Sequence, residues 1–305
     1  MSADAKRIER LKKKYGTKVI DNGMRLRPQD FLEEIEWRDK IDQHFTRAWL
    51  DFTYGGLFTR KALDERTRLL VSISQLTCLT EMEELERQIR SALAIGATPR
   101  EVLEVILQTT VYTGYPRASR GARLCVKVLE ELGRLDEITT TQLPLDGRIS
   151  ERSLDKERPS WPPAKSPEEK ARREEILKKY GWSGVSTRFR TQSHQGFENI
   201  DRFDRWAPDY LKLWFDYIYG ELYPRGIIDD RTRLLAMVAN CLALHEVKQL
   251  ENHMRGSLLF GATPRQVLEV ILQSTTYVGM PFCMTASSML ERILKEDGRL
   301  GEMKP

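Results

Sequence analysis

The sequence is poor in the residues that most often carry redox or metal chemistry. Its 305 residues include four cysteines and four histidines, and the cysteines form no CxxC pair. Such widely separated cysteines predict buried free thiols in a reducing cytoplasm rather than a disulfide framework. The four cysteines are Cys78, Cys125, Cys241 and Cys283.

Large net charge is also missing. The chain has 49 basic and 45 acidic residues, a formal net charge of +4. Nucleic-acid-binding proteins usually carry a larger basic excess gathered on one face, so no nucleic-acid partner is expected. The uncharged stretch 270–290 contains Gln273, a glycine, a proline and several hydroxyl side chains, which argues against a membrane span.

The histidines do not form a metal-ligand pattern. His245 and His253 are eight residues apart, about 80° around a helix axis, an awkward geometry for shared ligands. The remaining two, His44 and His194, are distant in sequence. We therefore expect no metal site.

What the chain does contain is an internal repeat with a constant offset. GATPREVLEVILQTTVYTGYP starts at Gly96, and GATPRQVLEVILQSTTYVGMP starts 165 positions later at Gly261. The same offset aligns WLDFTYGGLFTRKALDERTRLL (49–70) with WFDYIYGELYPRGIIDDRTRLL (214–235) without a gap. Two copies are too few for a solenoid, so we expect a fused dimer packed about a pseudo-two-fold axis.

The repeat predicts three parts of the chain. Residues 1–140 form the first unit, residues 170–305 form the second, and residues 141–169 join them. Because the joining segment is rich in proline and charge and has no apolar periodicity, we expect it to be exposed and extended.

Both units are predicted to be helical throughout, so the fold class is all-α with two tandem homologous domains. Thr98 can cap a helix that begins at Pro99, with Glu101 closing a capping box. The second copy repeats this pattern with Thr263, Pro264 and Gln266. The glycines that start both stretches suit a left-handed end of the preceding helix. The doubled stretch is thus predicted to be a helix hairpin.

The helix before this hairpin differs between the copies at chemically informative positions. Gln88 in the first copy corresponds to His253 in the second, and Glu84 corresponds to Gln249. Glu246, Gln249 and His253 would share one helix face. A partly desolvated histidine near a carboxylate can exchange a proton near neutral pH. The alternative is a histidine that is merely hydrogen-bonded in a packed interface.

The ordered blocks resemble the gamma-carboxymuconolactone decarboxylase family of the alkylhydroperoxidase D-like superfamily, over about 45–138 and 210–303. The family's helix usually carries a Glu followed four residues later by a His. These positions are Glu84 and Gln88 in the first copy, and Gln249 and His253 in the second, so each copy keeps half of the pair. Tandem members are a known variation of the family.

The thiol-bearing branch of the superfamily places a CxxC on the same helix. Those positions hold Glu81 and Glu84 in the first copy, and Glu246 and Gln249 in the second. The resemblance therefore implies no disulfide-based peroxidase activity.

The activity that the resemblance implies is a cofactor-free lyase, a decarboxylase of a carboxylated lactone or related activated acid from aromatic-compound catabolism. Loss of CO2 leaves an electron pair that must pass into a carbonyl stabilised by hydrogen-bond donors, and an acid must then protonate carbon. We interpret His253 as that acid, oriented by Glu246, Gln249 or Glu84. The second copy is then the catalytic one and the first a scaffold. The substrate-binding candidates are Arg255, Arg90, Tyr277, Tyr112, Gln273 and Gln108.

Two other functions stay open from the sequence. An isomerase, hydratase or cyclase on a related ring would use the same acid, because function depends on the site rather than the fold. A non-enzymatic helical protein that assembles or binds a small ligand would explain why neither copy has the complete Glu–His pair. The family commonly forms rings of single-domain subunits, often hexameric, so a fused pair is expected to form a homotrimer.

Overall fold

The computed structural model describes residues 3–143, 163–191 and 195–303, and these residues form helices and connecting turns with no strand. The all-α prediction is confirmed. Within the same ranges, no helix is long and apolar enough to cross a membrane.

Each repeat has a peripheral group of helices followed by a central group. In the first repeat the elements are α1 (Ala3–Tyr15), α2 (Thr17–Leu26), α3 (Phe31–Ile41), α4 (Gln43–Leu50), η1 (Asp51–Gly56), η2 (Leu57–Thr59), α5 (Glu65–Leu79), α6 (Met82–Ala94), α7 (Pro99–Leu107), α8 (Thr110–Glu131) and α9 (Asp136–Thr139). In the second they are α10 (Pro167–Tyr180), α11 (Trp182–Thr191), α12 (Glu198–Trp206), α13 (Pro208–Trp214), η5 (Phe215–Leu222), η6 (Tyr223–Arg225), α14 (Asp230–Leu244), α15 (Val247–Leu259), α16 (Pro264–Val278), α17 (Met280–Glu296) and η7 (Leu300–Met303).

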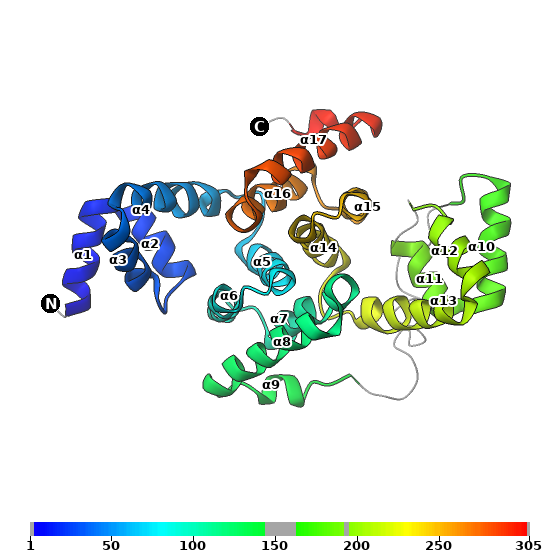
Figure 1. Ribbon diagram of the computed structural model, residues 1–305, viewed down its shortest axis with the longest axis horizontal. Coiled ribbons are helices and arrows are strands. Elements are labelled where there is room, and N and C mark those ends of the chain that lie inside the picture. The colour runs from blue at the N-terminus through cyan, green and yellow to red at the C-terminus, as the bar shows by residue number, and fades with distance from the viewer. Residues whose placement is uncertain (1–2, 144–162, 192–194, 304–305) are drawn as a thin grey trace.

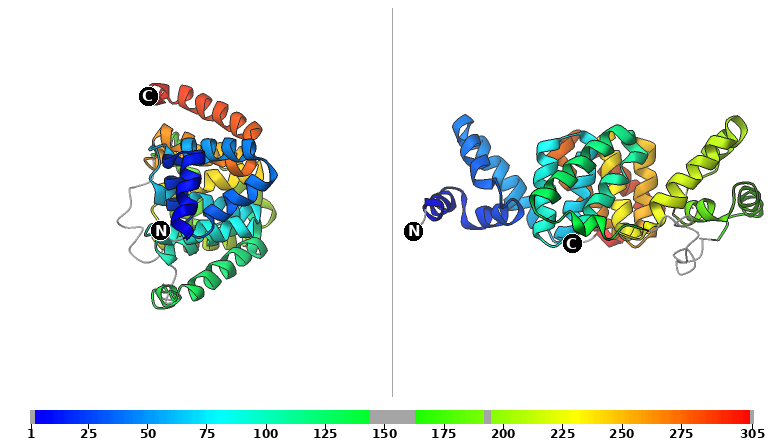
Figure 2. Two further views of the ribbon diagram at one scale, coloured as in Figure 1. Left: turned by 90° about the vertical axis from the view of Figure 1, so that its left-hand side faces the viewer. Right: turned by 90° about the horizontal axis from the view of Figure 1, so that it is seen from below.

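The two central groups form one helical block with a peripheral group at each end. Helices α1–α4 lie at one end and α10–α13 at the other, with α5–α9 and α14–α17 between them (Figures 1 and 2). At the centre α5 packs along α14. Every residue of α5 from Thr67 to Cys78 is buried, as is every residue of α14 from Thr232 to Ala243. Neither helix therefore has a solvent-exposed face, and its polar side chains are buried against other helices.

The doubled stretch forms the predicted helix hairpin in both copies. Thr98 and Glu101 close a capping box at the start of α7, and Thr263 and Gln266 do so at the start of α16. Gly114 interrupts α8 with φ 73°, and its equivalent Gly279 has φ 80° between α16 and α17. The copies thus share both the start and the bend of the hairpin.

Paired arginines and glutamates cross the repeat interface. Arg68 of α5 donates to Glu269 of α16 at 3.0 Å, and its equivalent Arg233 of α14 donates to Glu104 of α7 at 2.8 Å. Both glutamate side chains have zero exposure. Arg68 and Arg233 therefore form structural ion pairs, and they join the repeats symmetrically.

Most of the predicted joining segment, residues 144–162, lies outside the described residues. Its last part is helical, because α10 begins at Pro167 with Ser166 as its N-cap. The first unit's last helix, α9, ends at Thr139.

Candidate active site

Two cavities related by the repeat offset lie between the central and peripheral helices. The first cavity, beside α6, has a volume of about 630 Å³, and the second cavity, beside α15, has about 460 Å³. Ten of the thirteen residues that line the second cavity are positional equivalents of residues that line the first. The two cavities are therefore copies of one ancestral site. Tyr277 of the second repeat lines the first cavity, and Tyr112 of the first repeat lines the second. A complete cavity therefore needs both repeats.

His253 faces the second cavity and contacts the opposite repeat. Its Nε2 lies 2.7 Å from the hydroxyl oxygen of Tyr112, and the two rings meet edge to face with centroids 5.7 Å apart. The histidine is only 4 % exposed, yet it lines the cavity together with Tyr112. The imidazole is thus within reach of a cavity and coupled to a phenol that also lines it.

A group of tyrosines surrounds this pair. Burial raises the pKa of Tyr112 well above the usual value of about 10, and nearby Tyr223 raises it further. Burial also raises the pKa values of Tyr219 and Tyr223. All three line the second cavity, so they present neutral phenol groups as hydrogen-bond donors at neutral pH.

Arg188 of α11 brings a positive charge to the second cavity. It is 3 % exposed and lines the cavity with His253. Burial lowers the pKa of Arg188, and the charge of Arg173 acts in the same direction. A guanidinium stays protonated at neutral pH even so, and a bound anion would stabilise it.

The two repeats differ at two positions that make room for Arg188 in the second. In the first repeat, Gly23 packs directly against the ring of Phe31, and a Cβ on Gly23 would lie 1.9 Å from the ring's Cζ. In the second repeat the same two positions hold Arg188 and Gly196. The repeats therefore carry their large side chain at different positions. It is the apolar ring of Phe31 in the first repeat and the cationic Arg188 in the second.

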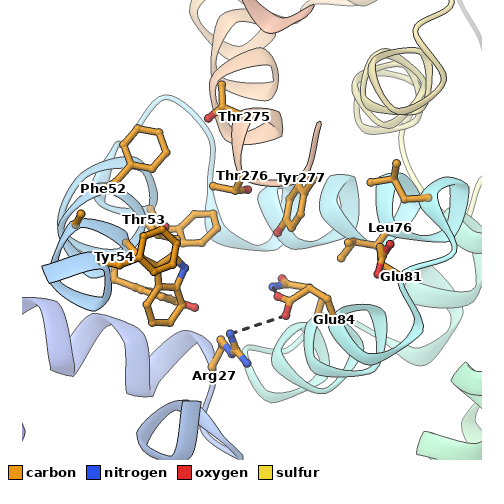
Figure 3. A pocket seen from close by; sticks show the side chains of 16 residues that line it. Arg27, Phe52, Thr53, Tyr54, Leu76, Glu81, Glu84, Thr275, Thr276 and Tyr277 are labelled. Carbon is orange, nitrogen blue, oxygen red and sulfur yellow. Dashed lines mark hydrogen bonds and ion pairs between the residues drawn. The ribbon is translucent and has the colours of Figure 1, made fainter. Parts of the chain in front are cut away.

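The first cavity is larger than the second and has more aromatic side chains in its lining. Phe52, Tyr54 and other side chains from α4 and η1 line one side, Leu76 and Glu81 line the other, and residues 275–277 enter from α16 (Figure 3). Glu84 replaces the second repeat's Gln249 and takes a hydrogen bond from Gln88 Nε2 at 2.9 Å. The imidazole of the second cavity is therefore replaced by an amide bound to a carboxylate.

An ion-pair network lies on one side of the first cavity, where Arg27 and Glu84 line it. Arg27 contacts Asp30 at 2.8 Å and Glu84 at 3.8 Å, and Figure 3 marks the contact with Glu84. Arg87 contacts Asp30 at 2.5 Å, Glu84 at 3.3 Å and Glu34 at 4.0 Å. Burial alone would lower the pKa of Arg27, but Tyr54, Glu84 and Asp30 outweigh it and raise that pKa. The cation of this cavity is thus already neutralised by carboxylates.

The second repeat lacks the charges of these five residues. All five charged positions hold Gln or Asn there, the first of them outside the described residues: Gln192, Gln195, Asn199, Gln249 and Asn252. The equivalent cavities therefore differ in charge as well as in the acid–base residue.

The model of the carboxymuconolactone decarboxylase family matches residues 43–126 and again residues 208–292, together more than half of the chain. The chain belongs to this family. It is a tandem member, with one family unit in each repeat.

Curated relatives match the chain over about one repeat. An uncharacterized 15.0 kDa protein of Paracoccus denitrificans is 36 % identical over 104 residues, which is 33 % of this chain and 78 % of the relative. A 4-carboxymuconolactone decarboxylase of Acinetobacter baylyi is 29 % identical over 99 residues, which is 32 % of this chain and 74 % of that enzyme.

Several residues proposed from the sequence do line the cavities of this family member. His253, Glu246, Gln249 and Tyr112 lie together around the second cavity. Glu84, Gln88 and Tyr277 lie around the first. Glu84 belongs to the other cavity, so the idea that it orients His253 across the interface does not agree with the structure.

Two arginines proposed to hold the substrate carboxylate are elsewhere. Arg90 pairs with Glu86 at 2.6 Å, and Arg255 pairs with Glu251 at 3.0 Å, one helical turn away in each case. Neither arginine lines the first or the second cavity. Both arginines lie on the outer faces of α6 and α15 and pair with surface carboxylates there. The prediction that they bind the substrate is therefore corrected.

Gln108 and Gln273 were proposed to line the pocket, but they are buried in the interface between repeats. Both have zero exposure, and they accept hydrogen bonds from Arg233 at 3.3 Å and Arg68 at 3.1 Å. Their amides extend the symmetric ion pairs between the repeats, so this assignment is corrected as well.

The cavity arginines were missed because they precede the family-matched regions. Arg27 follows α2, and Arg188 lies in α11, before residues 43 and 208, where the two matches begin. The signal was nevertheless present in the sequence, since Gly23 and Arg188 occupy one repeat position.

Within the described ranges, no group of three or more His, Cys, Asp or Glu side chains could hold a metal ion. His245 instead packs its ring against Phe282, with centroids 4.5 Å apart, and His194 lies outside the described residues. All four cysteines are buried and free, and burial raises the pKa of Cys125 to about 12.

Proposed function

We propose that the protein is a cofactor-free carboxy-lyase that acts in the second cavity, with His253 as the general acid. The substrate class is a carboxylated lactone or a related activated acid from aromatic-compound catabolism, and the expected location is the cytoplasm. Membership of the family and the decarboxylase among the relatives support the reaction class.

One observation carries the assignment to this cavity. Arg188, His253 and the phenol of Tyr112 line the same cavity of about 460 Å³. That combination supplies an anion-binding cation, a proton donor and a neutral hydrogen-bond donor, which are the groups that decarboxylation requires. The first cavity has no imidazole in its lining, and carboxylates neutralise its arginine.

In the proposed reaction, Arg188 holds the substrate carboxylate and orients the bond that will break. The carbon–carbon bond to that carboxylate breaks, CO2 leaves, and the electron pair passes into the conjugated lactone carbonyl. Phenol groups of Tyr219 and Tyr223 donate to the carbonyl oxygen as its negative charge develops. A proton then reaches carbon from His253, either directly or through Tyr112, and a solvent proton restores the imidazole.

Product analysis tests the proposal. Purified protein is incubated with 4-carboxymuconolactone and related unsaturated lactone acids, and released CO2 is measured against consumed substrate. We expect one CO2 to be released per substrate consumed, and we expect His253→Ala to abolish this release. An isomerised, hydrated or cyclised product that retains the carboxylate would instead assign the same acid to the isomerase, hydratase or cyclase alternative.

Assembly remains part of this proposal. Because single-domain family members commonly form rings, we propose that three tandem chains complete one ring. Light scattering coupled to size-exclusion chromatography should give three times the chain mass of 35.5 kDa. A monomer in solution would contradict the trimer but not the site.

A further inference from the structure

The first cavity is too well formed to be only a remnant of duplication. Its volume of about 630 Å³ lies in the range of ligand-binding pockets, and it is larger than the cavity that holds His253. Side chains of Phe45, Trp49, Phe52 and Tyr54 give it an aromatic lining. Aromatic walls of this kind favour a ring-bearing ligand that stacks or packs edge to face.

The charged residues that line the first cavity disfavour the binding of an anionic ligand. Arg27 already contacts Asp30 and Glu84. Glu81 also lines the cavity, as its equivalent Glu246 lines the second cavity, so Glu84 is the carboxylate by which the two linings differ. A ligand carboxylate would approach Glu81 and Glu84, and it would have to compete with Asp30 and Glu84 for Arg27. Like charges at such short range disfavour binding.

One residue of the cavity wall carries an acceptor that lacks a hydrogen-bond donor. Gln88 is 4 % exposed and lines the cavity, and its Nε2 is bound to Glu84. Its Oε1 is buried and has no partner among the described residues. Because a buried acceptor without a partner is costly, a ligand that brings an O–H or N–H group would stabilise this arrangement.

We propose that the first cavity is a second binding site, which takes an aromatic ligand with a hydrogen-bond donor and no anionic group. It therefore differs in ligand class from the carboxylate substrate proposed for the second cavity. The duplication has produced two sites of opposite charge preference within one chain.

Three naphthalene probes of similar size separate the features of the ligand. 2-Naphthol has a donor, 2-methoxynaphthalene has none, and 2-naphthoate is an anion. Binding of each is measured by isothermal titration calorimetry to the full chain. At this cavity, we expect naphthol to bind at least about tenfold more tightly than naphthoate, and more tightly than the methoxy compound.

Variants assign the binding to the first cavity. Ala48 is exposed and lines the cavity, so Ala48→Trp should fill it and remove the naphthol site. Ala94→Trp is the matched control, because Ala94 is exposed at the end of α6 and lines neither cavity. Equal naphthol binding by these two variants would overturn the proposal.

A second variant tests the charge argument without filling the cavity. Glu84→Gln installs the residue that the second repeat has at Gln249, and it should reduce the preference for naphthol over naphthoate about tenfold. An unchanged preference, or naphthoate binding as tight as naphthol at this site in the parent protein, would refute the proposed ligand class. Since the probes carry no lactone, these results do not depend on turnover at His253.

Discussion

The hydrogen bond between Tyr112 and His253 provides the sharpest test of the proposed chemistry. Tyr112→Phe removes one oxygen atom and leaves the ring in place, so the His253 Nε2 loses its partner at 2.7 Å. A buried hydrogen bond to a charged group is worth about 1.5–3 kcal/mol. At 1.36 kcal/mol per factor of ten, kcat should fall about ten- to 150-fold with little change in KM.

The pH dependence of kcat separates this effect from simple damage to the fold. Because Tyr112 contacts the nitrogen proposed to carry the proton, its loss should move the pH of half-maximal turnover. A structural defect would lower the rate by the same factor at every pH. In the parent protein, burial keeps the pKa of Tyr112 well above 10, so this phenol should not ionise and reduce turnover below about pH 10.

Two comparisons complete the test. Tyr115→Phe is the control, because Tyr115 is three residues from Tyr112, is 64 % exposed and does not line the second cavity. Tyr277→Phe makes the equivalent change in the first cavity. If Tyr277→Phe abolished CO2 release while Tyr112→Phe did not, turnover would belong to the first cavity and our assignment would be wrong.

Three further predictions concern the anion site, the interface and alkaline stability. Arg188→Gln should raise KM for a carboxylate substrate at least about tenfold, whereas exposed Arg205→Gln should not, as steady-state kinetics would check. Glu104→Gln leaves Arg233 buried without its carboxylate and should lower the free energy of unfolding in urea by about 3–5 kcal/mol; a loss below about 1 kcal/mol would refute the structural role of the pair. Burial raises the pKa of Tyr54 to about 12. Because the folded-state pKa lies above the unfolded value, the stability that this group contributes is complete below about pH 10 and falls by about 2 kcal/mol by pH 12. The free energy of unfolding from chemical denaturation should therefore decrease steadily across that range.

The interface explains how the cavities could diverge while the fold stayed the same. Arg68 with Glu269, and Arg233 with Glu104, keep the same residue types in both repeats. Each pair joins one repeat to the other, so a change in one member would leave a buried charge in the interface. The network beside the first cavity shares no residue with these pairs, and there the second repeat has amides at five charged positions.

The sequence was sufficient for the architecture because helix signals are local. Thr98 and Thr263 fixed helix starts, and Gly96 and Gly261 fixed the preceding turns, through interactions within a few residues. The constant offset of 165 then established two copies of one helical unit. It also placed His253 opposite Gln88, which identified the histidine as a residue of interest.

Only the tertiary structure decided which side chains meet. Arg255 and Arg90 looked suitable as substrate anchors, but helical spacing also places each within reach of a surface glutamate four residues earlier. Arg188 is 65 residues before His253 in the chain, and Tyr112 is 141 residues away from it in the other repeat. Contacts over such separations depend on how whole helices pack, a property that no local pattern encodes.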